Sequence, residues 1–231
     1  APVWGRPGAA APVLGDVRAV TGGGFAEGGD LVVSEETGGA VAVDPGAASQ
    51  GMVDRLREDG LTLRHVFLTH AHLDHVEGLH RVHEAVPEAP IWLHPADRPL
   101  FDSLSQQAAA FGMSFTEQPE PTEAFEHGQR IPFAGGAFHV RFAPGHAPGH
   151  VILIAEDEGF ALVGDVVFQR SIGRTDLPGG DFYTLMKSIR EQVLTLPDPT
   201  VLHTGHGPST TVGEEREGNP FLIGQYGGEL A

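Results

Sequence analysis

The chain has 231 residues, 40% of them hydrophobic, and a formal net charge of −17, which predicts a globular protein of one or at most two domains. The acidic balance argues against a nucleic-acid groove, because phosphate binding needs clustered lysine and arginine. Cysteine is absent, which leaves imidazole and carboxylate groups as the available strong metal ligands.

The first half of the chain alternates short apolar runs with helical patterns. Residues 1–12 are small, Pro/Gly-rich and aperiodic, so we expect a loose N-terminal arm followed by a single domain over residues 13–231. In chain order, the patterns predict strands at 31–34 and 40–43, a turn at 44–46, a helix at 52–58, a strand at 65–69, a helix at 76–86 and a strand at 91–93.

The second half continues in the same manner. Residues 118–126 are rich in Pro and Glu and are interpreted as a surface loop. Beyond them we expect strands at 137–143, 150–155 and 160–163, a helix at 182–196 and a last strand at 201–203. This order of elements favours sheets flanked by helices, a mixed α/β sandwich.

A dense group of metal-ligand residues follows the predicted strand at 65–69. His70 and His72 point to the same side in extended backbone, because side chains repeat every two residues. A turn then brings Asp74 and His75 to the start of the next helix. Four ligands for a divalent metal therefore converge at the carboxyl end of a strand, where α/β sheets commonly place their sites.

Three further ligand-type residues stand at predicted strand ends among turn residues: His146 in Pro-Gly-His, Asp165 in Gly-Asp and His206 in Gly-His-Gly-Pro. Each alone has an ordinary structural explanation, since a histidine in a turn is often solvated and an aspartate is often a turn former. Their common position at strand ends favours a single site shared with the first group.

These motifs, in this order, resemble the metallo-β-lactamase superfamily from about residue 13 to the C-terminus. The resemblance implies an αβ/βα four-layer sandwich with two metals between the sheet edges. It implies that His70, His72 and His146 hold one metal, that Asp74, His75 and His206 hold the second, and that Asp165 bridges them. Asp44 matches a position that orients a ligating histidine, although a plain turn role is equally open.

Residues 164–181, with 211–215 and 219–222, resemble the short bacterial glyoxalase II-like (hydroxyacylglutathione hydrolase-like) branch. This implies a metal-dependent thioester hydrolase that uses a bridging hydroxide between two divalent ions, with zinc expected and iron or manganese as alternatives. Asp74 and Asp165 are the predicted catalytic residues. Arg174 is predicted to bind a substrate carboxylate or to hold its own loop, and His150 and His203 are expected to be structural.

Other functions stay open at this point. A persulfide dioxygenase of the same superfamily would use one iron held by His70, His146 and Asp165, since two histidines and a carboxylate suit non-haem iron. A lactonase or β-lactamase is a second alternative, and a non-catalytic metal-binding protein is a third. We expect a small-molecule substrate and neither nucleic acid nor membrane as a partner. No apolar stretch suits a membrane span and no secretory signal opens the chain, so the expected location is cytoplasmic.

Overall fold

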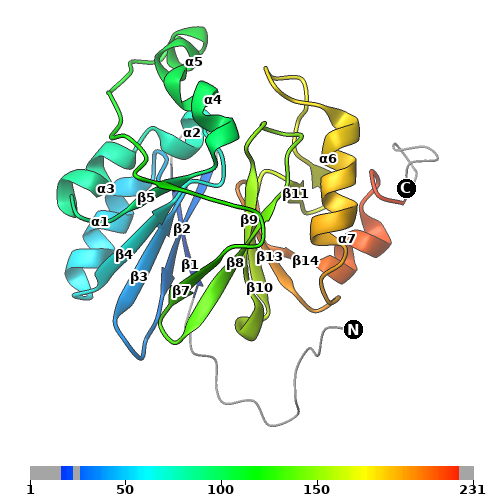
Figure 1. Ribbon diagram of the computed structural model, residues 1–231, viewed down its shortest axis with the longest axis horizontal. Coiled ribbons are helices and arrows are strands. Elements are labelled where there is room, and N and C mark those ends of the chain that lie inside the picture. Colours follow the sequence, from blue (N-terminus) through cyan, green and yellow to red (C-terminus); the bar gives the residue numbers. More distant parts are fainter. Residues whose placement is uncertain (1–16, 23–26, 224–231) are drawn as a thin grey trace.

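The computed structural model describes residues 17–22 and 27–223, and the expected arm at residues 1–12 lies outside them. Two six-stranded sheets face each other, and helices cover the outer face of each, with α1 and α3 beside one sheet and α6 and α7 beside the other (Figure 1). This is the αβ/βα four-layer sandwich, so the predicted fold class is confirmed. A single domain spanning residues 13–231 stays a prediction.

The first sheet has the strand order β1-β2-β3-β4-β5-β6. Its first three strands pair antiparallel and the rest pair parallel, which requires crossover connections that carry helices. Its strands are β1 (Val17–Gly22), β2 (Glu27–Val33), β3 (Gly39–Val43), β4 (Thr62–Phe67), β5 (Ile91–Leu93) and β6 (Glu123–Ala124). The connecting helices are α1 (Ser49–Glu58), α2 (Leu73–Val76), α3 (Leu79–Ala85), the 3₁₀ turn η1 (Pro95–Asp97), α4 (Arg98–Asp102) and α5 (Leu104–Ala110).

The second sheet has the order β14-β13-β10-β9-β8-β7, and a separate two-stranded ribbon pairs β11 with β12. The strands are β7 (Arg130–Phe133), β8 (Gly136–Phe142), β9 (Val151–Ala155), β10 (Phe160–Gly164), β11 (Val167–Phe168), β12 (Ser171–Ile172), β13 (Val201–Thr204) and β14 (Thr210–Thr211). The helical elements are η2 (Glu156–Glu158), α6 (Phe182–Ser188), the π-helical η3 (Ile189–Val193) and α7 (Val212–Gly218).

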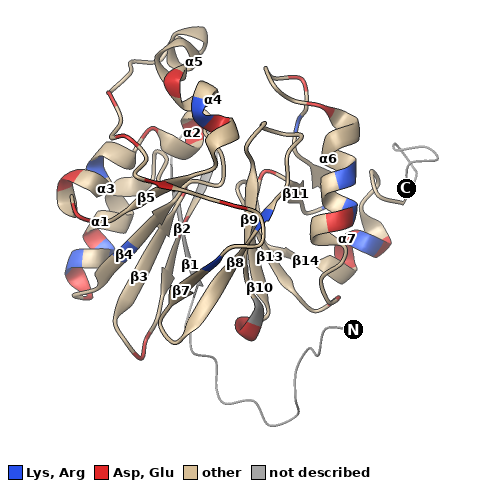
Figure 2. Cartoon of the chain, in the orientation of Figure 1, with Lys and Arg blue, Asp and Glu red and all other residues tan. Residues whose placement is uncertain are grey.

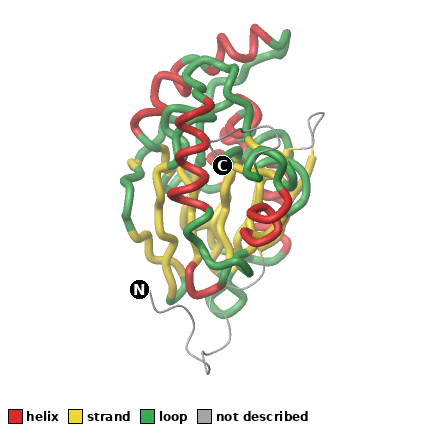
Figure 3. The backbone as a smooth tube through the Cα atoms, turned by 90° about the vertical axis from the view of Figure 1, so that its right-hand side faces the viewer, coloured by secondary structure: helices red, strands yellow, loops and turns green. Residues whose placement is uncertain are grey.

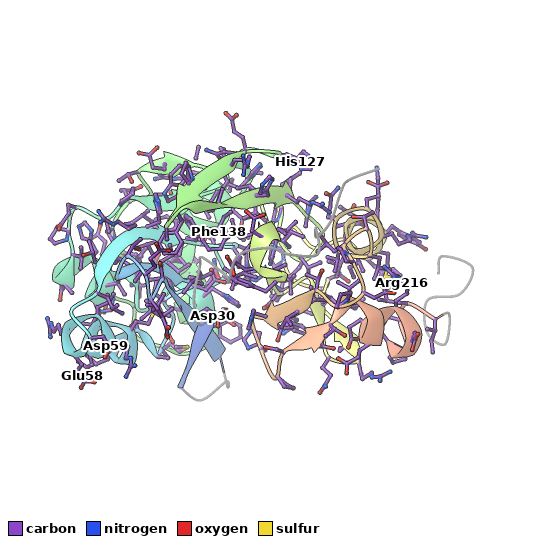
Figure 4. All side chains as sticks on the ribbon, turned by 90° about the horizontal axis from the view of Figure 1, so that it is seen from below. Asp30, Glu58, Asp59, His127, Phe138 and Arg216 are labelled. Carbon is purple, nitrogen blue, oxygen red and sulfur yellow. The ribbon has the colours of Figure 1, made fainter. Side chains whose placement is uncertain are left out.

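An apolar layer joins the two sheets. Phe138 of β8 is fully buried there and meets Phe67 of β4 edge-to-face, with ring centroids 5.5 Å apart; Figure 4 labels Phe138 in this interior. Such aromatic pairs stabilise a fold by about 0.5–1.5 kcal/mol beyond the area they bury. Strands β3, β9 and β10 are buried along their whole length, because helices cover the face that the other sheet does not.

Two predicted helices are interrupted in the structure. The helix expected at 76–86 is split into α2 and α3 at Gly78, whose N–H donates to the Pro45 carbonyl at 2.9 Å. A side chain at Gly78 would collide with Gly46 and Ser49, so this close approach of two loops requires glycine. The helix expected at 182–196 changes after Ser188 into the π-helical η3.

Two other expectations needed smaller corrections. The strand expected at 65–69 lies at Thr62–Phe67, and the residues after it form the extended start of a loop. The expected surface loop at 118–126 includes β6, and Gln118 within it is buried, donating to the Glu77 carbonyl and accepting from the His80 N–H. This segment is therefore tied to α2 and α3.

Loops from both sheets meet at one edge of the sandwich, which lies uppermost in Figures 1 and 3. One loop follows β4 of the first sheet, and three follow β8, β10 and β13 of the second. None of the helices in the described part of the chain has the length and hydropathy that crossing a membrane requires. The cytoplasmic location stays a prediction.

Candidate metal centre

Three buried histidines from the two sheets form a first donor group: His70, His72 and His146. The first two lie in the loop after β4, and the third lies in the loop after β8. His146 Nε2 is 3.2 Å from His70 Nε2 and 2.9 Å from His72 Nδ1. Nitrogens that share a tetrahedral ion at metal–nitrogen distances of 2.0–2.1 Å lie about 3.4 Å apart, so this spacing is close to that of a metal site.

Asp74, His75 and His206 form a second donor group. Asp74 and His75 occupy the first turn of α2, and His206 follows β13. His206 Nε2 lies 3.3 Å from His75 Nε2 and 3.3 Å from Asp74 Oδ2. A short helix and a distant strand end therefore bring two imidazoles and a carboxylate to one point.

Asp165 lies between the two donor groups, directly after β10. Its Oδ2 is 3.5 Å from His146 Nε2 and 3.3 Å from His206 Nε2, and its Oδ1 is 3.4 Å from His75 Nε2. Oδ1 is buried without a hydrogen bond to any described residue, as expected of an oxygen that accepts from a cation. A Cβ at Gly205 would overlap this oxygen and the His75 ring, so the centre closes only around glycine there.

Asp44 orients two of these histidines. Its Oδ1 accepts from the Thr69 N–H at 2.7 Å, and its Oδ2 accepts from the Thr69 hydroxyl at 2.6 Å and from His75 Nδ1 at 3.0 Å. The Thr69 hydroxyl also lies 3.1 Å from His70 Nδ1. With its Nδ1 proton directed at Asp44, His75 would present the Nε2 lone pair to a metal once the Nε2 proton has been released. The orienting role, which the sequence left open, therefore fits the contacts.

His150, expected to be structural, supports the centre directly. Its ring is fully buried, stacks on His70 at a centroid distance of 4.7 Å and accepts the Asp165 N–H at Nε2, at 3.0 Å. Burial lowers the pKa of His150 well below its usual value, so the ring stays neutral and keeps the lone pair that holds Asp165. His203 contacts Ser209 and Phe160 instead.

Asp97 is a residue that sequence reasoning missed. It is fully buried at the end of η1; its Oδ2 accepts the Ala71 N–H at 2.8 Å and its Oδ1 accepts the Gly149 N–H at 2.5 Å. One carboxylate thus joins the loop of His70 to the loop of His146. The available signal was its position, since it follows the predicted strand at 91–93 as the other site residues follow theirs.

The two donor groups carry different charge when no metal is bound. In the first, burial lowers the pKa of all three histidines: that of His70 well below its usual value, that of His72 to about 3, and that of His146 in the same direction. These rings are neutral at pH 7. His146 donates from Nδ1 to the Arg174 carbonyl at 2.8 Å, which leaves its Nε2 lone pair directed at the centre.

The second donor group holds protons. Burial would lower the pKa of His75, but Asp165 and Asp74 raise it well above its usual value. Hydrogen bonds to the same two carboxylates raise the pKa of His206 to about 9. Burial would raise the pKa of Asp165, yet His75 and His206 hold it well below its usual value. At neutral pH the metal-free group therefore pairs two imidazolium ions with two carboxylates.

This charge state predicts proton release on metal binding. A ligating imidazole must be neutral, and the raised pKa means that His206 keeps its proton below about pH 9. Adding zinc to metal-free protein at pH 7 should release at least about two protons, from His75 and His206, and up to one more from a water that the ions activate. Calorimetry in two buffers with different ionisation enthalpies measures that number. Binding heats that do not depend on the buffer would contradict the assignment.

A pocket with a volume of about 410 Å³ opens beside the centre. Asp74, Asp165 and His206 contribute to its wall, together with Arg174. The Arg174 guanidinium is held by Asp176 in two hydrogen bonds, Nε to Oδ1 at 2.7 Å and Nη2 to Oδ2 at 2.8 Å. Its role in substrate binding stays a prediction.

Two facing sheets, with histidines and aspartates gathered where their edges meet, define the class of metal-dependent hydrolases built on this sandwich. The profile described as "Metallo-beta-lactamase superfamily" matches residues 29–206. The chain belongs to this superfamily, as its motifs predicted, and is a metallo-hydrolase whose superfamily binds divalent metals.

Three individual relatives are similar to this chain over most of its length. Hydroxyacylglutathione hydrolase GloC of Haemophilus influenzae is 38% identical over 200 residues, which cover 86% of this chain and 93% of GloC. The crystal structure of TTHA1623 in a di-iron-bound form is 38% identical, with a TM-score of 0.81 over 89% of this chain and all of that one. The BLEG-1 B3 metallo-β-lactamase is 32% identical, with a TM-score of 0.84 over 90% of this chain and all of that one.

Proposed function

We propose that this enzyme hydrolyses thioesters at a centre of two divalent metal ions. The observation that carries the proposal is the place of Asp165, whose carboxylate lies within 3.5 Å of donor atoms from both groups. The similarity to GloC, a hydroxyacylglutathione hydrolase by name, supports thioesters as the substrate class. S-hydroxyacylglutathione is the first substrate to test.

Each donor group would hold one ion. The first ion would be held by His70, His72 and His146, the second by Asp74, His75 and His206, with Asp165 between them. Zinc is the proposed metal because it accepts imidazole and carboxylate ligands at near-tetrahedral spacing. Iron and manganese accept the same ligands, and the di-iron form of TTHA1623 makes iron the main alternative.

The chemistry divides between the ions and the chain. Two bound divalent ions would supply an activated water and stabilise negative charge that develops on the carbonyl oxygen. Asp74 is half-buried on the pocket side, where its carboxylate would accept a hydrogen bond from that water and orient it. Asp165 holds the two donor groups together, and Asp44 and His150 keep the ligands in place.

The acidic side chains that line the pocket indicate which leaving group the enzyme can release. A thiolate has a conjugate acid with a pKa of about 8.5, so it departs without a strong general acid. Among the described residues that line the pocket, Glu77 is the one carboxyl group outside the donor groups and Asp165. Burial and the nearby Asp74 raise its pKa. An alkoxide or amine leaving group would depend on such an acid for a proton, whereas a thiolate does not. A thioester therefore fits better than an amide.

Elemental analysis and one assay test the proposal. Protein purified without added metal should contain two divalent ions per chain, or take up two on loading. The loaded protein should release thiol from S-lactoylglutathione. A chain that carries both ions and hydrolyses no thioester would refute the proposed function. A β-lactam assayed in parallel would show whether the enzyme instead hydrolyses the substrate class that the name of BLEG-1 indicates.

One rival uses the same ligands. His146 Nε2 lies 3.2 Å from His70 Nε2 and 3.5 Å from Asp165 Oδ2. This set of two histidines and one carboxylate suits a single iron and oxygen chemistry. The second donor group, complete in the structure, favours two ions and hydrolysis. Oxygen consumption with glutathione persulfide, together with one iron per chain, would instead identify a persulfide dioxygenase.

A further inference from the structure

We infer that the pocket beside the metal centre binds an uncharged, apolar group of the thioester substrate. This inference rests on the proposed thioester hydrolysis and goes beyond it, because it names what the substrate carries next to the reacting carbonyl. Two observations support it: the apolar residues that line the pocket, and the pairing of the Arg174 guanidinium with Asp176.

Apolar side chains from two separate parts of the chain line the pocket. Leu73, Phe111 and Met113 come from the start of α2 and the segment after α5, and Phe168, Ile172 and Leu177 come from the β11–β12 ribbon and the loop after it. The volume of about 410 Å³ lies in the range of about 300–1,000 Å³ that small-molecule sites occupy. A methylene chain or ring would contact carbon from both parts.

Phe111 is the most informative of these residues. Its side chain remains 59% exposed although it stands at the pocket wall. A large exposed aromatic group next to a site is a common mark of apolar ligand contact, because water leaves its surface when a ligand covers it. Its exposure also means that the fold does not depend on the phenyl ring, so it can be substituted safely.

The charges around the pocket disfavour an anionic group. Arg174 carries the only guanidinium or ammonium group among the described lining residues, and Asp176 already binds it at two points. Glu77 lines the pocket with a carboxyl group of its own. In Figure 2 the backbone of the loop before α6 is coloured for both signs of charge, since it carries Arg174 and its partner Asp176. Away from the two ions, a carboxylate in this pocket would therefore meet the Glu77 carboxyl group and a guanidinium that Asp176 already binds.

The apolar group could belong to the acyl side or to the thiol side of the thioester, and two substrate series separate these sources. In the first, acyl chains of two to eight carbons share the uncharged thiol N-acetylcysteamine. In the second, acetyl thioesters carry alkanethiols of increasing length. In one series or both, kcat/KM of the metal-loaded enzyme should rise about threefold to fourfold per methylene until the pocket is full. Succinyl and lactoyl thioesters should fall below the butyryl thioester.

A matched pair of variants tests whether the dependence on chain length arises in the pocket. Phe111→Ser should lower kcat/KM for the best long-chain substrate about tenfold more than it lowers kcat/KM for the acetyl substrate of the shortest thiol. Tyr183→Ser is the control, because Tyr183 is 67% exposed and is not among the residues that line the pocket. It should leave both values unchanged.

The outcomes distinguish the inference from the proposed function. Thioester hydrolysis with no dependence on chain length in either series, or with a preference for the succinyl substrate, would overturn the inference and leave the function standing. If no thioester is hydrolysed, the function fails, and calorimetry with the matching non-hydrolysable amides still tests the pocket. Hexanoyl amide binding more weakly than succinyl amide would then overturn the inference as well.

Discussion

Replacing Asp165 with alanine should remove at least one metal ion per chain and lower the rate of thioester hydrolysis by more than about 100-fold. This effect exceeds the loss of about 10- to 100-fold that is typical of mutating a residue that only hydrogen-bonds to a metal ligand. The physical reason is its position: its oxygens lie within 3.5 Å of His75, His146 and His206. Asp44, the other buried carboxylate beside both donor groups, contacts His75 at Nδ1, on the side of the ring away from the centre. Its loss also leaves the raised pKa of His75 without its main cause.

Elemental analysis after gel filtration gives the metal count, and thiol release gives the rate. Asp59→Ala is a suitable control, since Asp59 is exposed at the end of α1, pairs with Arg55 and lies at the outer edge of the molecule (Figure 4). Asp165→Asn should retain more metal than Asp165→Ala, because one oxygen still accepts. Two ions per chain in the alanine variant would rule out the bridging position of this carboxylate.

Much of the centre could be predicted from the sequence because its ligands stand directly after predicted strands. His70 and Asp165 each follow a short apolar run bounded by turn residues, a pattern that is consistent with a buried strand. Parallel and mixed sheets then place the ends of several strands at one edge. The seven predicted ligands are together in the structure for this reason, although their binding of metal stays a prediction.

The parts that could not be predicted depend on contacts between distant segments. Gly78 breaks a regular helical pattern because the loop at Gly46 packs against it, and nothing within residues 76–86 records that contact. The pairing of Arg174 with Asp176 likewise depends on the backbone after β12. Local periodicity predicts which face of an element is buried, but not which neighbour is pressed against it.

The role of Asp97 also depends on contacts between distant segments. Replacing Asp97 with asparagine should have the second large effect, on metal affinity. The carboxylate accepts two backbone N–H groups, from Ala71 and Gly149. An amide has one acceptor oxygen, so its NH₂ group would face the remaining N–H in a fully buried site. A buried donor left without an acceptor costs about 1–3 kcal/mol, and the two ligand loops should move apart to relieve it.

Metal affinity should therefore fall about 10- to 100-fold in Asp97→Asn, the range found for groups that support metal ligands. Competition with a chelator measures it, and Asp102→Asn, which changes an exposed carboxylate paired with Arg98, is the matched control. Excess metal should restore kcat, because Asp97 contacts backbone N–H groups and no predicted ligand atom. Wild-type affinity in the variant would show that the loops hold their positions without this carboxylate. A loss of kcat that persists at saturating metal would mean that loop position governs the reaction itself, as well as the binding of the ions.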